Sequence, residues 1–263
     1  MPRDKRPYVC AVYAFARTAD DFADEGTDEP YVRLRKLDEW QEKLDRAYQG
    51  NADHPVFVAL AETASRTGIA KSLLSDLIAA FRMDVTKTRH GSEAELLQYC
   101  ALSANPVGRI VLQIFGDASP RACALSDSIC SGLQIANFAQ DVSADWRKGR
   151  LYLPLDDMGR FGYTEQDLDR GVVDGRFRDV MKLQVGRARA LLLRGSPLVG
   201  EAPRAIRFEL ALTVRGGLSI LKRVEKRGFD VLHGRPVIGL VEKGLIVVQA
   251  IGQRNAWTSP RPR

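Results

Sequence analysis

The stretch that decides the fold is Gln134–Asp145, which reads QIANFAQDVSAD. If it forms a helix, the polar residues at i, i+3, i+7 and i+11 share one face, namely Gln134, Asn137, Asp141 and Asp145. The residues between them are mostly small or apolar, so water does not surround this helix. Two carboxylates one turn apart repel each other, and near a helix C-terminus the macrodipole disfavours each by about 0.3–1 kcal/mol. Because a divalent cation would remove both penalties, the stretch predicts half of a metal site.

A second stretch, Tyr13–Glu25, repeats this arrangement and reads YAFARTADDFADE. We expect a helix over Val9–Glu25 that stops at Gly26 and carries four polar side chains on one face, Tyr13, Arg17, Asp20 and Asp24. Asp21 is a further acid beside this face. Both stretches therefore close an apolar helix with an Asp-x-x-x-Asp pair. If the two helices face each other, the carboxylates converge on one cavity.

The composition allows a sizeable core, because 45% of the 263 residues are hydrophobic. We expect a single domain over 1–263, with a short flank over 1–6 and a frayed tail over 252–263. The net charge of +6 and the pI near 9.2 suit an anionic ligand or an acidic membrane surface. Nucleic-acid binding is not expected, because the basic residues are scattered and no basic run is interleaved with aromatic residues.

The cysteines and histidines do not predict a zinc site. The four cysteines form no C-x-x-C pair, and the three histidines are far apart in the sequence. We interpret the cysteines as buried free thiols of a reducing compartment. The N-terminus lacks the apolar core of a signal peptide, and no run of about 18 apolar residues could span a membrane. We therefore expect a cytoplasmic protein, with peripheral contact to the inner face of the membrane as an option.

Helical patterning dominates the chain, so the predicted fold class is all-α with about ten helices. Besides the two acidic helices, the second of which begins near Ala118, we expect helices over Glu29–Gln49, Pro55–Arg66, Lys71–Arg89, Phe177–Leu193, Ala202–Glu225 and Pro236–Ile251. Ser92 and Glu95 predict a capping box for a helix that runs to Phe115 with a kink at Pro106. Arg147–Tyr163 is the longest irregular segment, and Thr164 with Asp167 caps the return to helix.

Together these residues resemble the squalene/phytoene synthase family. The resemblance rests on YAFARTADDFADE at 13–25 and on NFAQDVSAD at 137–145, which GRLYLP follows at 149–154. Two aspartate motifs about 120 residues apart with a Gly-Arg-x-Tyr-x-Pro segment are specific in combination. FRMDVTKTR at 81–89 and YCALSANPVGR at 99–109 also match, and the latter resembles the hydroxysqualene synthase branch of bacterial hopanoid biosynthesis. The resemblance extends from about Pro7 to Ile251 and implies an isoprenoid-synthase-type helical bundle with a central apolar cavity.

Two departures from the family pattern bear on the expected activity. Family members usually carry a further segment with Ser and Phe that helps to close the diphosphate site, whereas here only Met1–Arg6 precede the first helix. This predicts a truncated or misassigned start, which leaves full activity open. Gln140 stands before Asp141, where many squalene and phytoene synthases have Arg. The resemblance therefore implies handling of one diphosphate rather than two, which again favours the hydroxysqualene branch.

The resemblance implies a Mg²⁺-dependent reaction that begins with ionisation of a prenyl diphosphate. The implied metal ligands are Asp20, Asp21, Asp24, Asn137, Asp141 and Asp145. The implied substrate contacts come from Arg17, Gln134, Asn137, Lys148 and Arg150. The tyrosines implied around the carbocation, where each ring face stabilises positive charge by about 1–2 kcal/mol, are Tyr13, Tyr99 and Tyr152. The simpler alternatives are a solvated helix end for either acidic motif alone, a packing hydrogen bond for Gln134, core aromatics for the tyrosines and a surface position for Asp84.

The expected function is conversion of presqualene diphosphate to hydroxysqualene, in which the subfamily resemblance alone implies the final capture of water. The alternative is head-to-head condensation of two farnesyl diphosphates, or of longer donors to phytoene. A non-catalytic assembly protein is disfavoured by the intact acids, and a basic RNA-binding protein rests on net charge alone. No Gly-rich dinucleotide motif occurs, so no bound nicotinamide is expected. We expect Arg147–Pro154 to act as a mobile flap over the diphosphate.

Overall fold

The computed structural model describes residues 1–26, 28–237, 239, 244, 246 and 250. Within them the chain is all-helical, as predicted, and pairing of extended segments is limited to an isolated bridge between Arg89 and Leu151. The helices are α1 (Arg6–Asp24), α2 (Pro30–Tyr48), α3 (Pro55–Thr67), α4 (Lys71–Thr86), α5 (Glu93–Ser103), α6 (Asn105–Ile114), α7 (Pro120–Arg147), α8 (Leu155–Arg160), α9 (Glu165–Asp169), α10 (Gly175–Gly195), α11 (Leu198–Glu201), the 3-10 helix η1 (Arg204–Ile206) and α12 (Arg207–Lys226). The helix expected over Pro236–Ile251 falls mostly, and the tail over 252–263 wholly, outside the described residues.

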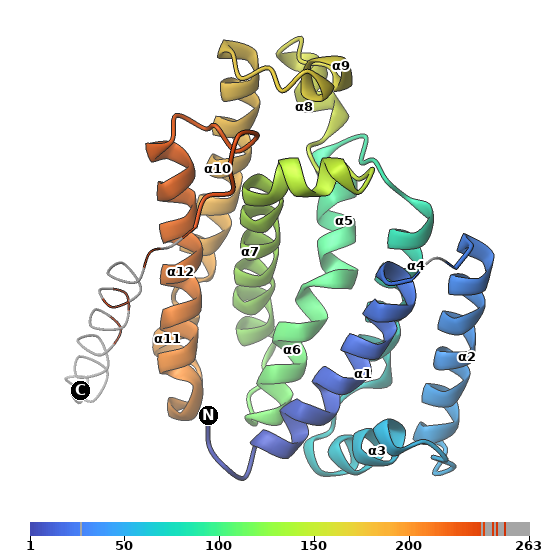
Figure 1. Ribbon diagram of the computed structural model, residues 1–263. Coiled ribbons are helices and arrows are strands. Elements are labelled where there is room, and N and C mark those ends of the chain that lie inside the picture. Colours follow the sequence, from blue (N-terminus) through green and yellow to red (C-terminus); the bar gives the residue numbers. More distant parts are fainter. Residues whose placement is uncertain (27, 238, 240–243, 245, 247–249, 251–263) are drawn as a thin grey trace, which may run out of the picture.

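The helices α5, α6 and α7 lie between α1–α4 and α10–α12 (Figure 1), and they contribute residues to two hydrophobic clusters. In the first, α1, α2 and α3 bring together the rings of Phe15, Trp40 and Phe57, whose centroids lie 4.5–6.0 Å apart. In the second, α7 packs against α10 and α12. Phe115, just after α6, packs against both clusters and joins them into one domain. Within the described residues, no helix has the length and apolar content needed to cross a bilayer.

Glycines allow α7 to lie close to α10 and α12. A Cβ atom on Gly195 of α10 would lie 2.5 Å from Ile129 Cγ1 and 2.6 Å from the carbonyl oxygen of Leu125. A Cβ atom on Gly217 of α12 would lie 2.8 Å from Leu133 Cδ2. Because van der Waals repulsion excludes such contacts, the absence of a side chain at these two positions sets the distance between the helices.

The helix expected to run from residue 92 to 115 is two helices. Ser92 caps α5, and its Oγ accepts the amide of Glu95 at 3.3 Å. The capping box is incomplete, because the Glu95 carboxylate accepts the amide of Gly91. Pro106 is the second residue of α6 rather than the centre of a kink. Proline is well tolerated in the first turn, where the missing N–H has no partner to lose, so it begins a new helix here.

The segment expected to be irregular, Arg147–Tyr163, contains α8. The acidic residues Asp156 and Asp157 in its first turn favour the helix, because they lie at the positive end of its dipole. Asp157 also accepts hydrogen bonds from Arg187 and Gln184 of α10, which hold α8 against the bundle. The capping box of Thr164 beyond it is present, as the sequence predicts.

The four cysteines are free thiols, as expected, but they are not all buried. Cys100 is buried, whereas Cys10 is exposed. The buried face of α1 consists of Ala11 and three further residues spaced by four, Phe15, Ala19 and Ala23. Cys10 lies about 100° from Ala11 around the helix, which turns its side chain toward water.

Candidate functional site

The first acidic motif occupies the end of α1, where Asp24 is the last helical residue. Arg17, two turns earlier, pairs with three acids at 2.6–3.1 Å, namely Asp20, Asp21 and Glu25. One carboxylate oxygen of Asp21 is nevertheless buried without a well-formed hydrogen bond. Burial and the neighbouring Asp24 raise the pKa of Asp20 above its ordinary value. The motif thus holds more negative charge than its own surroundings neutralise.

Arg33 of α2 caps this end of α1 from the side. Its guanidinium donates to the carbonyl oxygens of Ala23 at 2.8 Å, Gly26 at 2.9 Å and Asp28 at 2.9 Å. The cation therefore lies at the negative end of the helix dipole and offsets part of the penalty for the acids there. Sequence reasoning missed Arg33, because it belongs to another helix and to no motif.

The second acidic motif occupies the last two turns of α7. Asp141 pairs with Arg235, whose Nε and Nη2 both donate to the carboxylate, the latter at 2.9 Å. Burial, followed by the charge of Asp141, raises the pKa of Asp145 to about 6, and Asp24 of the first motif adds to the shift. The acids of the two motifs are thus close enough to repel each other. Arg235 was missed, because it lies in no helix and 94 residues from Asp141.

Arg150 joins the two motifs. It follows α7 by three residues, and its Nη2 and Nη1 lie 2.5 Å and 3.1 Å from the two carboxylate oxygens of Asp24. Burial alone would raise the pKa of Asp24, but the hydrogen bonds and charge of Arg150 hold it below its ordinary value. One guanidinium therefore links the end of α7 to the end of α1, as convergence of the motifs requires.

The segment that carries Arg150 is anchored to the chain after α4. The amide of Leu151 donates to the carbonyl oxygen of Thr88 at 2.9 Å, and that of Leu155 donates to His90 at 2.9 Å. The side chains of Leu151 and Leu153 are buried. If the whole segment Arg147–Pro154 moved as a flap, these hydrogen bonds would break. Gly149, whose φ of 76° is unfavourable for other residues, is held as well, because its amide donates to the carbonyl oxygen of Trp146 at 2.9 Å and its own carbonyl oxygen accepts from Arg89 at 2.7 Å.

An aromatic cluster lies beside Arg150, formed by Tyr152 of the anchored segment, Phe138 of α7, Tyr99 of α5 and His90. The rings of Phe138 and Tyr152 stack at 3.8 Å with an interplanar angle of 7°. His90 stacks on Tyr152 at 5.6 Å, and Tyr99 lies 5.8 Å from Tyr152. Burial and the charge of Lys87 lower the pKa of His90 to about 4, so its ring is neutral at physiological pH. The cluster thus offers aromatic faces without a competing cation of its own.

Asp84 of α4 contacts this cluster and is largely shielded from water, rather than lying at the surface. It accepts the Tyr99 hydroxyl at 2.8 Å and the Tyr152 hydroxyl at 3.4 Å. Burial raises the pKa of Asp84 to about 6 despite the opposing effect of these hydrogen bonds and of Arg150. The sequence held one signal for it, since Asp84 lies within the family-like stretch FRMDVTKTR.

The other sequence-predicted residues lie at the edge of the site. Tyr13 is 68% exposed on the outer face of α1, one turn before Arg17. Lys148 is exposed, but its charge lowers the pKa of both Asp24 and Asp145. The structure thus places two of the three tyrosines in the aromatic cluster, Tyr99 and Tyr152, and leaves Tyr13 outside its ring contacts.

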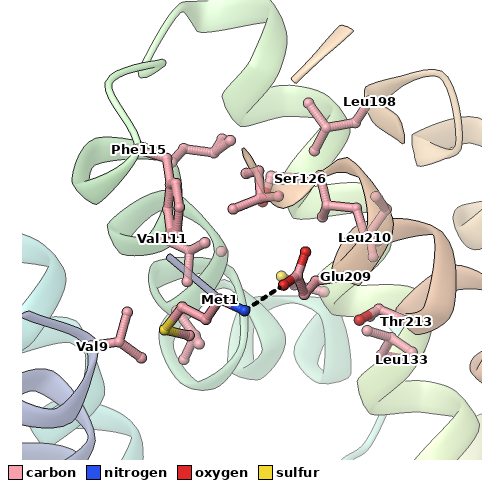
Figure 2. Close-up of a pocket in the computed structure, with 16 residues that line it drawn as sticks. Met1, Val9, Val111, Phe115, Ser126, Leu133, Leu198, Glu209, Leu210 and Thr213 are labelled. Atoms are coloured by element: carbon pink, nitrogen blue, oxygen red, sulfur yellow. Dashed lines mark ion pairs between the residues drawn. The ribbon is translucent and has the colours of Figure 1, made fainter. Parts of the chain in front are cut away.

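Three hollows follow one another along α7. The first, an apolar cavity of about 330 Å³, is lined by residues such as Val111, Phe115, Leu133 and Leu210, and the Met1 amino group pairs with Glu209 at its edge at 3.0 Å (Figure 2). The second, an amide hollow of about 350 Å³, is lined by Leu133, Gln134, Asn137 and Gln140. The third, a charged hollow of about 240 Å³, is lined by Gln140, Asp141, Arg147, His233 and Arg235.

Neighbouring hollows share lining residues. Leu133 lines both the apolar cavity and the amide hollow, and Gln140 lines both the amide hollow and the charged hollow. Gln140 itself is buried and donates to the carbonyl oxygen of Pro236 at 2.5 Å. Leu133 precedes Asp141 by eight residues, which is about 12 Å along the helix. The surface of α7 therefore changes from apolar to charged over a distance that suits an amphipathic ligand.

The acids suit a divalent-cation site that further oxygen ligands would complete. Among the described residues, no three His, Cys, Asp or Glu side chains are already gathered around one metal position. Asp145 with its raised pKa and the buried oxygen of Asp21 are nevertheless groups that a cation would stabilise. Mg²⁺ in proteins commonly takes only one or two carboxylates, together with phosphate oxygens and water. The residues present fit that mode of binding rather than a closed protein cage.

Comparison with known proteins gives the family. The profile of the squalene/phytoene synthase family matches residues 1–242. The phytoene synthase of Arthrospira platensis is 33% identical over 251 residues, which cover 90% of this chain and 81% of that protein. Phytoene synthase 1 of Zea mays is 30% identical, and the match covers 96% of this chain but 63% of that protein.

A solved structure gives the same result. The crystal structure of squalene synthase HpnC from Alicyclobacillus acidocaldarius is 36% identical and superposes with a TM-score of 0.84. The superposition covers 88% of this chain and 86% of that one, so the likeness extends over the whole bundle. The chain therefore belongs to the squalene/phytoene synthase family, whose members act on prenyl diphosphates.

Proposed function

We propose that this protein converts presqualene diphosphate and water into hydroxysqualene and diphosphate, with Mg²⁺ as cofactor. The observation that carries the proposal is the row of hollows along α7, which begins at the apolar cavity and ends at Asp141 of the second acidic motif. An apolar chain with a diphosphate at one end matches that change in polarity. The net charge of +6 further supports an anionic substrate and contact with an acidic membrane surface.

In this proposal the cations and acids bind the diphosphate end. Arg17, Arg150 and Lys148 offer charged donors, and Asp20, Asp24, Asp141 and Asp145, with Asp21 and Asn137 beside them, would hold the metal. When bound, Mg²⁺ supplies the charge that makes diphosphate a good leaving group. Gln134 and Asn137 would contact the substrate between its two ends, because both line the amide hollow.

The aromatic cluster would then face the cation left on the prenyl chain. Tyr152 and Tyr99 are held by Asp84, and Tyr152 also stacks on Phe138, so the two ring faces need little reorganisation when positive charge develops. Buried leucines such as Leu151 and Leu153 exclude water beside the cluster. Tyr13 would act only from the rim, because its ring is exposed.

Head-to-head condensation of two prenyl diphosphates is the second candidate. The relatives from Arthrospira platensis and Zea mays, at 33% and 30% identity, favour it, because both are phytoene synthases. Against it stands Gln140, which supplies no cation before Asp141 and is turned into the protein toward Pro236. Arg235 is the cation beside Asp141 instead.

Product identification separates the two candidates. The purified protein with Mg²⁺ is incubated separately with presqualene, farnesyl and geranylgeranyl diphosphate, and the extracted lipids are identified by mass spectrometry. Hydroxysqualene from presqualene diphosphate, formed without NADPH, supports the proposal. Phytoene or presqualene diphosphate from the other substrates supports condensation. Squalene formed only with NADPH would assign the protein to the squalene synthases.

A further inference from the structure

We propose that Arg150 and Arg235 change partners when substrate binds, from a motif carboxylate to the diphosphate. The consequence is that the protein binds Mg²⁺ and diphosphate far more tightly together than it binds either alone. This inference rests on the proposed function and concerns the way its site assembles.

The first of the two ion pairs, Arg150 with Asp24, blocks both oxygens of a motif carboxylate. The two nitrogens of the guanidinium lie 2.5 Å and 3.1 Å from the two oxygens of Asp24. The pair is largely shielded from water, since the side chains are 17% and 29% exposed. A metal ion that takes an oxygen of Asp24 must therefore displace a hydrogen bond of Arg150.

The second ion pair, Arg235 with Asp141, has the same form in the other motif. The Nε and Nη2 atoms of Arg235 donate to the two oxygens of Asp141. Here the acid is the shielded partner, at 14% exposure, whereas Arg235 is 55% exposed and lines the charged hollow. One carboxylate of each motif is thus held by an arginine that also faces the place proposed for the diphosphate.

Displacing these arginines without a new partner is unfavourable. A guanidinium as shielded as that of Arg150 would be left as an uncompensated charge close to the incoming metal ion. Mg²⁺ alone therefore meets both a competitor for the carboxylate and a repelling charge. Diphosphate alone meets arginines that are already paired, beside repelling acids such as Asp145. When both arrive, each arginine regains a charged acceptor and each acid gains a cation.

The resulting coupling is reciprocal. If diphosphate raises the affinity for Mg²⁺, then Mg²⁺ raises the affinity for diphosphate by the same factor, typically about 5–150-fold. Lys148 does not produce this effect, because its charge acts on Asp24 and Asp145 without a hydrogen bond to block either of them. Arg150 and Arg235, by contrast with Lys148, both block a carboxylate and offer a forked donor to phosphate.

Titration calorimetry on the full chain tests the exchange, with Mg²⁺ and inorganic pyrophosphate as probes. Mg²⁺ affinity is measured with and without saturating pyrophosphate for the wild type, Arg150→Gln and Arg235→Gln. Complex formation between the probes in solution is the same for all proteins and cancels in the comparison. We expect each variant to bind Mg²⁺ alone about tenfold more tightly than the wild type, and to lose most of the enhancement by pyrophosphate.

Two control variants isolate the exchange from other effects. Arg189→Gln removes a bidentate pair with Glu225 between α10 and α12, at 2.7–2.8 Å, and should leave both affinities unchanged. Lys148→Gln removes a nearby charge without removing a hydrogen bond to an acid. An equal gain in Mg²⁺ affinity in Lys148→Gln would overturn the exchange, because loss of positive charge alone would then explain the gain. Unchanged Mg²⁺ affinity in both arginine variants would also overturn it. A wild type that binds neither probe would overturn the proposed function as well.

Discussion

The hydroxyl of Tyr99 donates to Asp84 Oδ1 over 2.8 Å, which places a carboxylate beneath an aromatic cluster. Tyr152 approaches the same oxygen at 3.4 Å from the segment after α7. Asp84 thereby links three parts of the chain, α4, α5 and the anchored segment that carries Arg150. Its role is to position the two rings, and its burial has a consequence for stability.

Replacing Asp84 by Asn should change how stability depends on pH. The folded-state pKa of Asp84 is about 6, against an ordinary value of 3.8, because the side chain is buried. Between these values the folded protein keeps a proton that the unfolded chain has lost, so this carboxyl makes stability fall as pH rises from 4 to 6. Asp84→Asn should therefore gain up to about 3 kcal/mol relative to the wild type across this window. Urea unfolding at several pH values measures the difference, and a difference that does not vary with pH would contradict it.

The ring of Tyr152 should matter more than its hydroxyl. Tyr152→Phe keeps the face that stacks on Phe138, whereas Tyr152→Leu removes the face offered to a cation. A loss of about 1–2 kcal/mol, or roughly 5–30-fold in kcat/KM, is expected for Tyr152→Leu and much less for Tyr152→Phe. Tyr31→Leu serves as the control, because this ring of α2 is 70% exposed. Equal losses in both Tyr152 variants would assign the effect to the hydroxyl.

The acids should be needed for turnover but not for folding. Asp20→Ala and Asp141→Ala each remove a carboxylate from a helix end where it is electrostatically unfavourable. Turnover should fall by at least about a hundredfold, while helical circular dichroism persists. Asp179→Ala, at an exposed position of α10, is the control for loss of an acid. Normal turnover in either motif variant would remove these acids from the site.

Ligand binding should protect the chain around Gly149 from proteolysis. Arg147 and Lys148 are exposed, whereas Leu151 is fixed by its bond to Thr88. Trypsin cleavage at these two residues should slow by severalfold when Mg²⁺ and a diphosphate analogue are present together, and not with either alone. Arg150→Ala should abolish the protection and slow turnover, while Arg160→Ala on α8 should do neither. Cleavage at an unchanged rate in the ternary mixture would leave the segment without a part in ligand binding.

Filling the apolar cavity should weaken binding of the prenyl chain alone. Val111→Phe adds a ring to the lining of the cavity shown in Figure 2. The KM for the prenyl diphosphate should rise by about tenfold, because a steric misfit in an apolar pocket costs about 1–3 kcal/mol of binding free energy. The affinity for pyrophosphate should stay the same. Val58→Phe on the exposed face of α3 is the matched control. An unaltered KM would place the prenyl chain elsewhere.

The sequence predicted most of the helices and both acidic motifs, because each depends on spacing within one segment. Apolar periodicity gave α1 and α7 to within three residues at each end. Arg235, by contrast, meets Asp141 from 94 residues away, and no local pattern announces such a contact. The burial of Asp84 likewise depends on how α4, α5 and a loop pack together. Tyr13 shares its face of α1 with Arg17, but periodicity could not show that this face is exposed there.

The absence of a side chain at Gly217 reaches further than helix packing. Leu133, the residue a methyl group there would strike at 2.8 Å, lines both the apolar cavity and the amide hollow. A single added carbon on α12 would thus displace a leucine that lines both hollows. For protein engineers, the proposed position of the prenyl chain makes its length tunable from a residue that lines the amide hollow without carrying any chemistry. Libraries that vary only the large lining side chains would overlook it.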